Sequence, residues 1–275
     1  MPELPEVETI RARLAPVLEG RRLVRVAIVD PRLTRPFDPI EVAAELEGEQ
    51  VAALARRGKY LVVRFRSGRS LLIHLRMTGS FHYGPSGTLQ DDPYRRAVVT
   101  LDNGSDVGYK DVRRFGTWLL LEPGELEPYL AVRLGAEPLE PGFTTRFLGE
   151  RLSDRRAPVK AALLDQRTVA GLGNIYADEA LWRARVHPLK PAGTVERAEL
   201  RSIRRGIRRA LELGIARQGA TLRDYSAPDG SRGSMQEEFK VYGRAGEPCP
   251  RCGTPIEKTR AAGRGTWYCP SCQRL

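Results

Sequence analysis

The chain has 275 residues, of which 45 are Lys or Arg and 34 are Asp or Glu, so its formal net charge is +11. Hydrophobic residues make up 41% and charged residues 29%, which supplies a buried core and excludes both a disordered chain and an acidic tail protein. The whole positive excess lies in residues 151–275, and most basic residues are Arg, whose guanidinium matches phosphate geometry. A polyanion is therefore the expected partner, and an Arg-rich composition with merely solvated charges is the alternative.

No apolar run approaches the roughly 18 residues that a membrane-spanning helix needs. The first residues are acidic, unlike the basic start and apolar stretch of a secretory signal peptide. We therefore expect a soluble protein that is neither secreted nor bound to a membrane. At about 100–200 residues per domain, the length predicts two domains.

The first predicted element is a helix over residues 5–18, because Pro5 stands near its first turn and apolar residues recur at helical spacing. Beyond Gly20, short β-rich segments alternate with Gly, Pro and Asp. Many short strands at such spacing predict a β-sandwich or a barrel. The expected strands cover residues 24–29, 51–54, 60–65, 70–74, 97–101, 106–109 and 117–121.

The second half of the chain has a helical pattern. Pro and Gly concentrate in residues 134–142, which predicts a linker, and we place the boundary near 135–148. The helix predicted over residues 195–218 has an apolar stripe and an opposite face of five Arg, which either tracks phosphates or is simply solvated. Residues 219–236 are expected to form a long, mobile loop. The other expected helices cover residues 143–152, 159–165 and 174–184.

All four cysteines lie near the end of the chain, as two Cys-x-x-Cys pairs sixteen residues apart. This spacing is typical of tetrahedral zinc bound by four thiolates, and such a closed shell leaves no open coordination position. We therefore expect one structural zinc ion that folds a small ribbon, and a pair of redox dithiols is the alternative. Between the pairs, a Gly-containing hairpin tip carries Arg264 and suits a phosphate contact. The predicted ligands are Cys249, Cys252, Cys269 and Cys272.

The N-terminus is the second candidate site. The initiator Met is normally removed before Pro, which would leave Pro2 with a free secondary amine. An α-amino group has a pKa near ~7.7–8.0, so a sizeable fraction is unprotonated and nucleophilic near neutral pH. Such an amine can attack an aldehyde-level carbon and form an iminium, while Glu3 and Glu6 stand beside it to move protons. The alternative is ordinary helix-start chemistry, in which the acids complement the helix dipole.

Seven motifs occur together and in order over nearly the whole chain, which makes their combination far more specific than any one of them. They are the N-terminal PELPEVE, RGKYL at 57–61, HLRMTG at 74–79, DVRRFG at 111–116, GNIYA at 173–177, VYGR at 241–244 and the four-cysteine ribbon. With these motifs the chain resembles the bacterial formamidopyrimidine-DNA glycosylases. The resemblance implies a cytoplasmic bacterial protein that is associated with the nucleoid when bound to DNA.

The resemblance implies an α+β multidomain fold with DNA between its lobes. Residues 1–135 would form an N-terminal catalytic β-sandwich with a flanking helix, and 136–148 a linker. Residues 149–236 would form a helix-two-turns-helix domain with a loop that caps the lesion, and 237–275 the zinc ribbon. The expected partner is damaged double-stranded DNA, bound by a monomer with zinc and no small-molecule cofactor.

The implied activity is excision of oxidised purines such as 8-oxoguanine and formamidopyrimidines, followed by strand cleavage through β,δ-elimination. Pro2 would be the nucleophile that attacks C1′ of the damaged nucleotide. Glu3 would act as general acid and base during sugar-ring opening, and Glu6 would support that proton transfer. Because such an enzyme must reach C1′ and read the base edge, the damaged base has to leave the stack.

The resemblance also assigns residues to DNA. Met77, Arg113 and Phe115 would fill the gap left by the flipped base, and core packing is the alternative for Met77 and Phe115. Lys59, His74, Asn174 and Arg264 would clamp phosphates, with Lys59 and Arg264 also counted as catalytic, and Arg114 and Tyr176 are further DNA-binding candidates. The alternatives for the clamp are an edge-strand gatekeeper for Lys59, a core histidine for His74 and a helix N-cap for Asn174.

Three positions depart from the family pattern. Val112 stands where Pro is usual, Arg76 where Gly is common, and Met235 where an aromatic residue usually caps the everted base. Val112 leaves the working side chains in place, and Arg76 either repositions Met77 or adds a phosphate contact. Met235 makes the preference for 8-oxoguanine less certain than the chemistry itself.

Two rival interpretations remain. The first is a relative that prefers oxidised pyrimidines, as in endonuclease VIII, but Leu4 and the intact Arg113 to Phe115 run argue against it because that branch tends to lack them. The second is a zinc-ribbon DNA-binding protein without catalysis, to which the C-terminal charge and Cys spacing alone would equally point. Pro2 separates the two classes, because a pure binder needs no free N-terminal amine.

Overall fold

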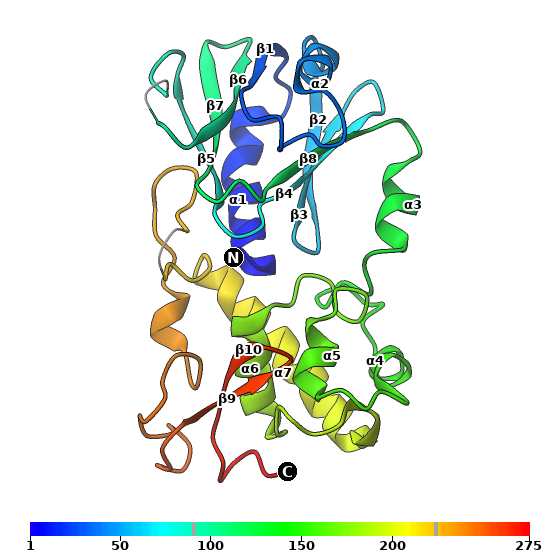
Figure 1. Ribbon diagram of the computed structural model, residues 1–275, viewed down its shortest axis with the longest axis vertical. Coiled ribbons are helices and arrows are strands. Elements are labelled where there is room, and N and C mark those ends of the chain that lie inside the picture. The colour runs from blue at the N-terminus through cyan, green and yellow to red at the C-terminus, as the bar shows by residue number, and fades with distance from the viewer. Residues whose placement is uncertain (90–91, 223–224) are drawn as a thin grey trace. The chain divides into compact units, whose positions relative to one another are not determined.

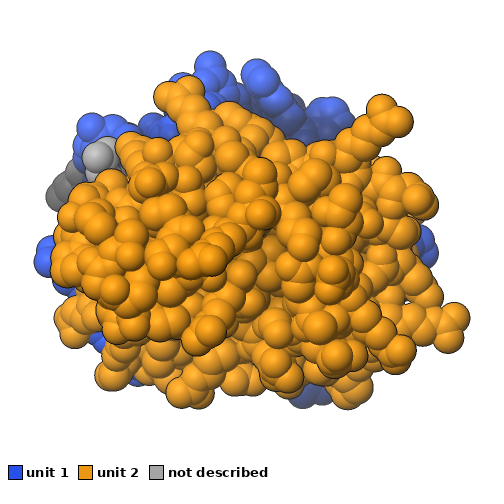
Figure 2. All heavy atoms as spheres, turned by 90° about the horizontal axis from the view of Figure 1, so that it is seen from below, with its two compact units in different colours: residues 1–130, 218–234 blue, residues 131–217, 235–275 orange. Residues whose placement is uncertain are grey.

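The computed structural model describes residues 1–89, 92–222 and 225–275. The chain forms two compact units (Figures 1 and 2). The first unit combines residues 1–130 with 218–234, and the second combines 131–217 with 235–275. No helix within these described ranges is long and apolar enough to span a membrane.

The first unit is built on two four-stranded sheets in which every pairing is antiparallel. One sheet has the order β1 (Leu23–Ile28), β6 (Arg95–Leu101), β7 (Ser105–Asp111), β5 (Gly79–Pro85). The other has the order β2 (Val51–Arg57), β3 (Tyr60–Phe65), β4 (Ser70–His74), β8 (Thr117–Leu121).

Helix α1 (Leu4–Leu18) shares one hydrophobic core with both sheets. Its stripe of Val7, Ile10, Leu14 and Leu18 is almost completely buried against residues of both sheets. Two sheets that enclose a common core form a sandwich, so the expected sandwich with a flanking helix is confirmed.

Three elements of the first half of the chain were not predicted. Helix α2 (Pro39–Leu46) begins after Asp38, whose side chain accepts hydrogen bonds from the first turn, and Pro39 is its first residue. An Asp before the helix and a Pro at its first position are both start signals that can be recognised in the sequence. Strand β5 was not predicted because Gly79 and Gly84 interrupt its alternating pattern. The short helix α3 (Leu126–Ala131) was not predicted because Pro128 lies inside it.

The second unit is mainly helical. Helices α6 (Asn174–Ala184) and α7 (Arg197–Ala216) pack closely because Gly206 has no side chain, and a Cβ there would lie 2.5 Å from the carbonyl oxygen of Ala180. The predicted apolar stripe of α7 is buried, from Leu200 to Leu211. The elements are α4 (Thr145–Leu152), α5 (Val159–Leu164), α6 (Asn174–Ala184), η1 (Ala192–Thr194), α7 (Arg197–Ala216), η2 (Met235–Glu238), β9 (Glu257–Ala261) and β10 (Arg264–Tyr268).

Part of the Arg face of α7 has a role that neither interpretation foresaw. Arg204 and Arg208 donate to the backbone carbonyls of Phe143 and Pro138, at 2.5 and 3.2 Å. These two side chains therefore hold the segment that precedes α4 against α7.

The predicted long loop is divided between the units. Residues 218–234 group with the sandwich, and an isolated bridge joins Ala220 to Ser234. Met235 is completely buried at the start of η2. Residues 223–224 of this loop lie outside the described residues, and the domain boundaries drawn from the sequence stay a prediction.

Candidate functional site

The N-terminus is held by a capping box at the start of α1. Glu3 is the N-cap residue, and its side chain accepts from the backbone N–H of Glu6, while the Glu6 side chain accepts from the backbone N–H of Glu3 at 2.8 Å. Both carboxylates are buried. Pro2 is also buried, whereas Met1 is exposed. The structure therefore brings Pro2, Glu3 and Glu6 together, as the sequence predicted.

Glu6 has a second partner. Its Oε1 accepts from the backbone N–H of Ala220 at 2.8 Å, and a Cβ on the preceding Gly219 would come within 2.8 Å of its Cγ. Gly219 has a φ of +80°. Only glycine combines that conformation with so close an approach. Both oxygens of Glu6 thus hold backbone groups, so its geometry is that of an anchor between α1 and the 218–234 loop.

Lys59 lies in the turn between β2 and β3 of the second sheet, and His74 is the last residue of β4. Lys59 is buried in the β2–β3 turn, and Tyr60 pairs with His74 across β3 and β4, with their rings in edge contact at 4.8 Å. His74 Nδ1 accepts from the backbone N–H of Arg76 at 3.0 Å. Burial, helped by the charges of Arg76 and Lys59, lowers the pKa of His74 to about 3. The imidazole is therefore neutral and offers its Nε2–H as a donor.

The three predicted insertion residues lie on two loops of the first unit. Phe115 and Arg113 are exposed, and the Arg113 guanidinium stacks on the Phe115 ring at 4.8 Å. Core packing is therefore excluded for Phe115. Met77 is half-buried on the loop between β4 and β5.

Arg114 does not join the stacked pair of Arg113 and Phe115, and its guanidinium bonds to Asp30. It donates two hydrogen bonds, of 2.6 and 2.8 Å, to buried Asp30, and this contact holds the pKa of Asp30 below its usual range. Its φ is +58°, so the ion pair stabilises a left-handed turn. Arg114 was predicted to bind DNA, and here its guanidinium secures the loop that presents Arg113 and Phe115.

In the second unit, Asn174 and Arg264 meet at the ribbon hairpin. Asn174 is the first residue of α6 and Gly173 is the cap, so the N-cap alternative for Asn174 is wrong. The Asn174 amide donates to the carbonyl of Gly265 at 3.1 Å, next to exposed Arg264 at the start of β10. Tyr176 is completely buried.

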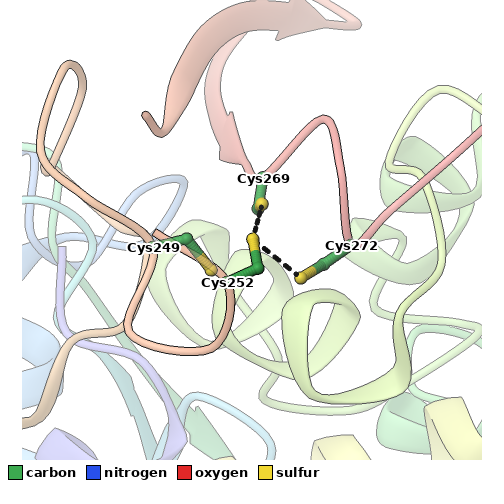
Figure 3. A group of neighbouring side chains, drawn as sticks. All are labelled: Cys249, Cys252, Cys269 and Cys272. Atoms are coloured by element: carbon green, nitrogen blue, oxygen red, sulfur yellow. Dashed lines mark hydrogen bonds between the residues drawn. The ribbon is translucent and has the colours of Figure 1, made fainter. Parts of the chain in front are cut away.

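The four cysteine thiols converge from the loops that flank the hairpin (Figure 3). Their sulfur atoms all lie within 4.8 Å of one another, and Cys252 is 3.5 and 3.4 Å from Cys269 and Cys272. Four thiolates around zinc at about 2.3 Å place sulfurs about 3.8 Å apart, so the cluster fits one zinc ion. The expected structural zinc site is confirmed.

The ribbon is fixed to the helical part around this cluster. Trp182 of α6 donates its indole N–H to the Cys249 sulfur at 3.4 Å, and the Arg251 guanidinium stacks on the Trp182 ring at 4.1 Å. A donor to a ligating sulfur orients the ligand from outside the metal shell.

Sequence reasoning missed the buried charges behind these sites. Lys160 and Asp178 form a completely buried ion pair of 2.8 Å, and Lys160 also donates to the same Gly265 carbonyl that Asn174 reaches. Burial raises the pKa of Asp178, and the Lys160 charge opposes that rise. Buried Glu179 accepts from three successive backbone N–H groups, those of residues 240–242. The only sequence signal was a pair of acids directly after the GNIYA motif.

Three family models match the chain. The formamidopyrimidine-DNA glycosylase N-terminal domain matches residues 1–118, and the H2TH domain of that family matches residues 134–226. A zinc finger found in FPG and IleRS matches residues 246–275.

Relatives match over whole chains. The formamidopyrimidine-DNA glycosylase of Symbiobacterium thermophilum is 49% identical over 99% of this chain and 89% of its own. That of Geobacillus kaustophilus is 45% identical and both chains are covered completely.

Solved structures of relatives superpose on the whole chain. A variant of the Lactococcus lactis enzyme in complex with DNA containing Fapy-dG superposes with a TM-score of 0.94 at 36% identity over the full length of both chains. The MutM (FPG) protein of Thermus thermophilus superposes with a TM-score of 0.88 at 41% identity, over 99% of this chain and 98% of that one. The chain belongs to the formamidopyrimidine-DNA glycosylase family, and it is a DNA glycosylase with a structural zinc ribbon.

Proposed function

We propose that this enzyme excises oxidised purines from duplex DNA and then cleaves the strand, with Pro2 as the nucleophile. The buried capping box that fixes Pro2 beside Glu3 and Glu6 carries the proposal. Family members act on DNA lesions of this kind, and the Lactococcus lactis relative was crystallised with a Fapy-dG duplex.

The chemistry follows from the position of Pro2 at a helix start. Removal of Met1 frees a secondary amine there, and the positive end of α1 disfavours a second positive charge, which favours the nucleophilic form. The nitrogen attacks C1′ as the bond from C1′ to the damaged base breaks, and the base leaves with the bonding electrons and takes a proton from water. Glu3 accepts the proton that the amine loses. Glu3 then delivers a proton to the ring oxygen as the sugar opens and the iminium forms. Elimination of the two flanking phosphates cleaves the strand.

Glu6 supports this step by position. Its two oxygens hold the Glu3 backbone and the Ala220 backbone, so it fixes the Glu3 main chain relative to the loop that follows α7. We assign it a positioning role and leave the proton transfer to Glu3.

Each unit supplies candidate groups for DNA contact. We assign the charged phosphate contacts to Lys59 and Arg264, and neutral contacts to the Nε2–H of His74 and the amide of Asn174. Arg113 and Phe115 are exposed as a stacked pair, a form suited to enter a duplex when the lesion leaves the stack. One chain supplies all of these groups, so we propose a monomer that works in the bacterial cytoplasm.

Borohydride trapping tests the proposal. The purified enzyme is mixed with duplexes that contain 8-oxoguanine, an abasic site or an oxidised pyrimidine, and the iminium is reduced to a stable adduct. We expect adducts with the 8-oxoguanine and abasic duplexes. An adduct with the pyrimidine lesion alone would place the enzyme with endonuclease VIII in its substrate choice.

Two controls isolate the amine. Pro2→Gly keeps a free N-terminal amine and should trap weakly, whereas a chain with a blocked N-terminus should bind DNA and not trap at all. Undiminished trapping by the blocked chain would overturn the role of Pro2.

A further inference from the structure

Two loops that carry proposed insertion residues meet at the same end of two paired strands of the first sheet. The Met77 loop, residues 75–78, leads into β5, and the Arg113–Phe115 loop, residues 112–116, follows β7. Strands β5 and β7 are neighbours, and their register places Gly79 opposite Asp111. The two loops therefore start from directly paired positions although the sequence separates them by more than thirty residues.

The carboxylate of Asp111 bonds to both loops. Asp111 is 1% exposed. Its Oδ1 accepts from the hydroxyl of Thr78, the neighbour of Met77, and from the backbone N–H of Arg113 at 3.2 Å. Its Oδ2 accepts from the backbone N–H of Gly116 at 2.7 Å. One buried side chain thus fixes both ends of the Arg113–Phe115 loop and the residue that follows Met77.

Thr78 closes the connection. Its hydroxyl oxygen accepts from the same Arg113 N–H at 3.0 Å, and its hydroxyl hydrogen is donated to the Asp111 carboxylate. The Arg113 N–H is therefore shared between Thr78 of the Met77 loop and Asp111 at the end of β7. A displacement of one loop would break a hydrogen bond of the other.

The phenol of Tyr109 lies beneath both loops and keeps them from moving inward. A Cβ on Gly79 or on Gly116 would overlap its hydroxyl oxygen. Tyr109 is completely buried, and among the described residues its hydroxyl has no hydrogen-bond partner. The hydroxyl acts as a spacer that both glycines abut, so the loops rest on one rigid side chain.

We propose that Asp111 is a positioning residue that couples Met77 to Arg113 and Phe115, so that the two loops enter the duplex as one unit. The inference rests on the proposed function, because it takes these three side chains as the groups that enter DNA. Asp111 touches no reacting atom in this scheme, and it acts only through the loops.

The same strand supplies a matched control. Asp106 of β7 is 3% exposed and accepts from the Thr100 hydroxyl at 2.7 Å and from the backbone N–H of Gly87 at 2.9 Å. It combines a threonine hydroxyl and a loop N–H as Asp111 does, yet it holds the loop after β5, which carries no proposed DNA contact. Loss of either carboxylate removes a buried anchor, and only Asp111 is tied to insertion.

The test compares Asp111→Asn and Thr78→Val with Asp106→Asn and Thr100→Val. The reporter is 2-aminopurine next to 8-oxoguanine, whose fluorescence rises when the stack is opened, followed by stopped flow alongside single-turnover base release. We expect Asp111→Asn and Thr78→Val to slow stack opening and base release together by about 10-fold to 100-fold, the effect of a misplaced group. Strand cleavage at a preformed abasic site, where no base must leave the stack, should fall by less than about threefold.

Rescue and coupling sharpen the test. Thr78→Ser keeps the hydroxyl and should open the stack at the rate of the unaltered enzyme. In the double variant, Asp111→Asn should slow stack opening little beyond the effect of Thr78→Val alone, because both substitutions break the same connection. Equal slowing by the Asp106 and Asp111 variants at matched Tm would overturn the coupling and leave a general effect of folding. Absence of trapping by the unaltered enzyme would instead overturn the proposed function.

Discussion

The insertion loops of the first unit and the ribbon hairpin of the second present exposed groups on differently built supports. Arg113 and Phe115 stand on Asp111, whose partners are a hydroxyl and backbone N–H groups. Arg264 stands on a hairpin that a metal cluster and the buried Lys160–Asp178 pair hold. In the first support, neutral groups donate hydrogen bonds to the Asp111 carboxylate. In the second, the Lys160 ammonium pairs with the Asp178 carboxylate.

The difference predicts how each support fails. Loss of Asp111 or Thr78 removes hydrogen bonds of two loops and leaves the sandwich core intact, so damage to the first support stays local. A buried charge left without its partner is expensive, and a ribbon of this size has only a small core of its own, so damage to the second support spreads through the hairpin.

The largest effect is expected from loss of zinc. Cys252→Ser, or treatment with a strong chelator, should weaken binding to lesion DNA by about 100-fold or more, because metal binding supplies the ribbon's folding energy. Binding is measured by fluorescence anisotropy, with readdition of zinc as the control for the chelated sample. The amine of Pro2 is untouched, so trapping should return at high enzyme concentration. Undiminished affinity of the zinc-free protein for lesion DNA would show that DNA binding does not depend on the zinc-folded ribbon.

The buried ion pair comes next. Lys160→Met should lower the free energy of unfolding by about 3–5 kcal/mol, because it strands the Asp178 carboxylate in the interior. The double variant Lys160→Met and Asp178→Leu removes both charges and should recover much of that loss. Urea denaturation measures both. A double variant that is as unstable as the sum of its parts would show that the pair does not act as one unit.

Acid should destabilise the first unit through His74. Its pKa in the folded protein, about 3, lies below the value of ~6.5 in the unfolded chain, so the stabilisation is complete above pH 6.5 and is lost as the pH falls toward 3. The slope is at most about 1.4 kcal/mol per pH unit. His74→Asn should flatten this part of a plot of urea midpoint against pH. An unchanged slope would exclude His74 as its source.

Charged and neutral phosphate contacts should differ in salt dependence. Lys59→Ala and Arg264→Ala should each reduce the slope of log K against log salt by about 1, because each removes one released counterion. His74→Ala should weaken binding with the slope unchanged, because its imidazole is neutral. A change of slope in the His74 variant would mean that the imidazole is charged when DNA is bound.

The smallest effect concerns Arg76, whose φ of +53° lies in the left-handed region. Arg76→Gly should raise the free energy of unfolding by up to about 1 kcal/mol, because glycine adopts this conformation without strain. Arg76→Ala, which keeps the strain, is the control, and thermal unfolding measures both. Equal Tm values for the two variants would show that the backbone is not strained at this position.

Local signals in the sequence were enough for the elements whose residues are neighbours along the chain. The stripe of α1, the strand runs and the paired cysteines each lie within a few residues, so helix, strand and metal ligands followed from spacing. The combination of ordered motifs identified the family. Glu3 and Glu6 were singled out as neighbours of Pro2, whereas their capping box was recognised only in the structure.

Only the tertiary structure decided what holds these parts together. Asp111 reaches Thr78 across 33 positions, and Lys160 reaches Gly265 across 105. The sequence does not distinguish a buried lysine from an exposed one, because burial depends on residues that are far away along the chain. Arg114 shows the same limit: its predicted DNA contact stays a prediction, and no local signal in the sequence indicated its ion pair with Asp30, 84 positions away. The sequence by itself determined the family, the metal ligands and most of the elements, because these follow from local spacing and motifs, and the long-range contacts decided which side chains are exposed and which ones support them.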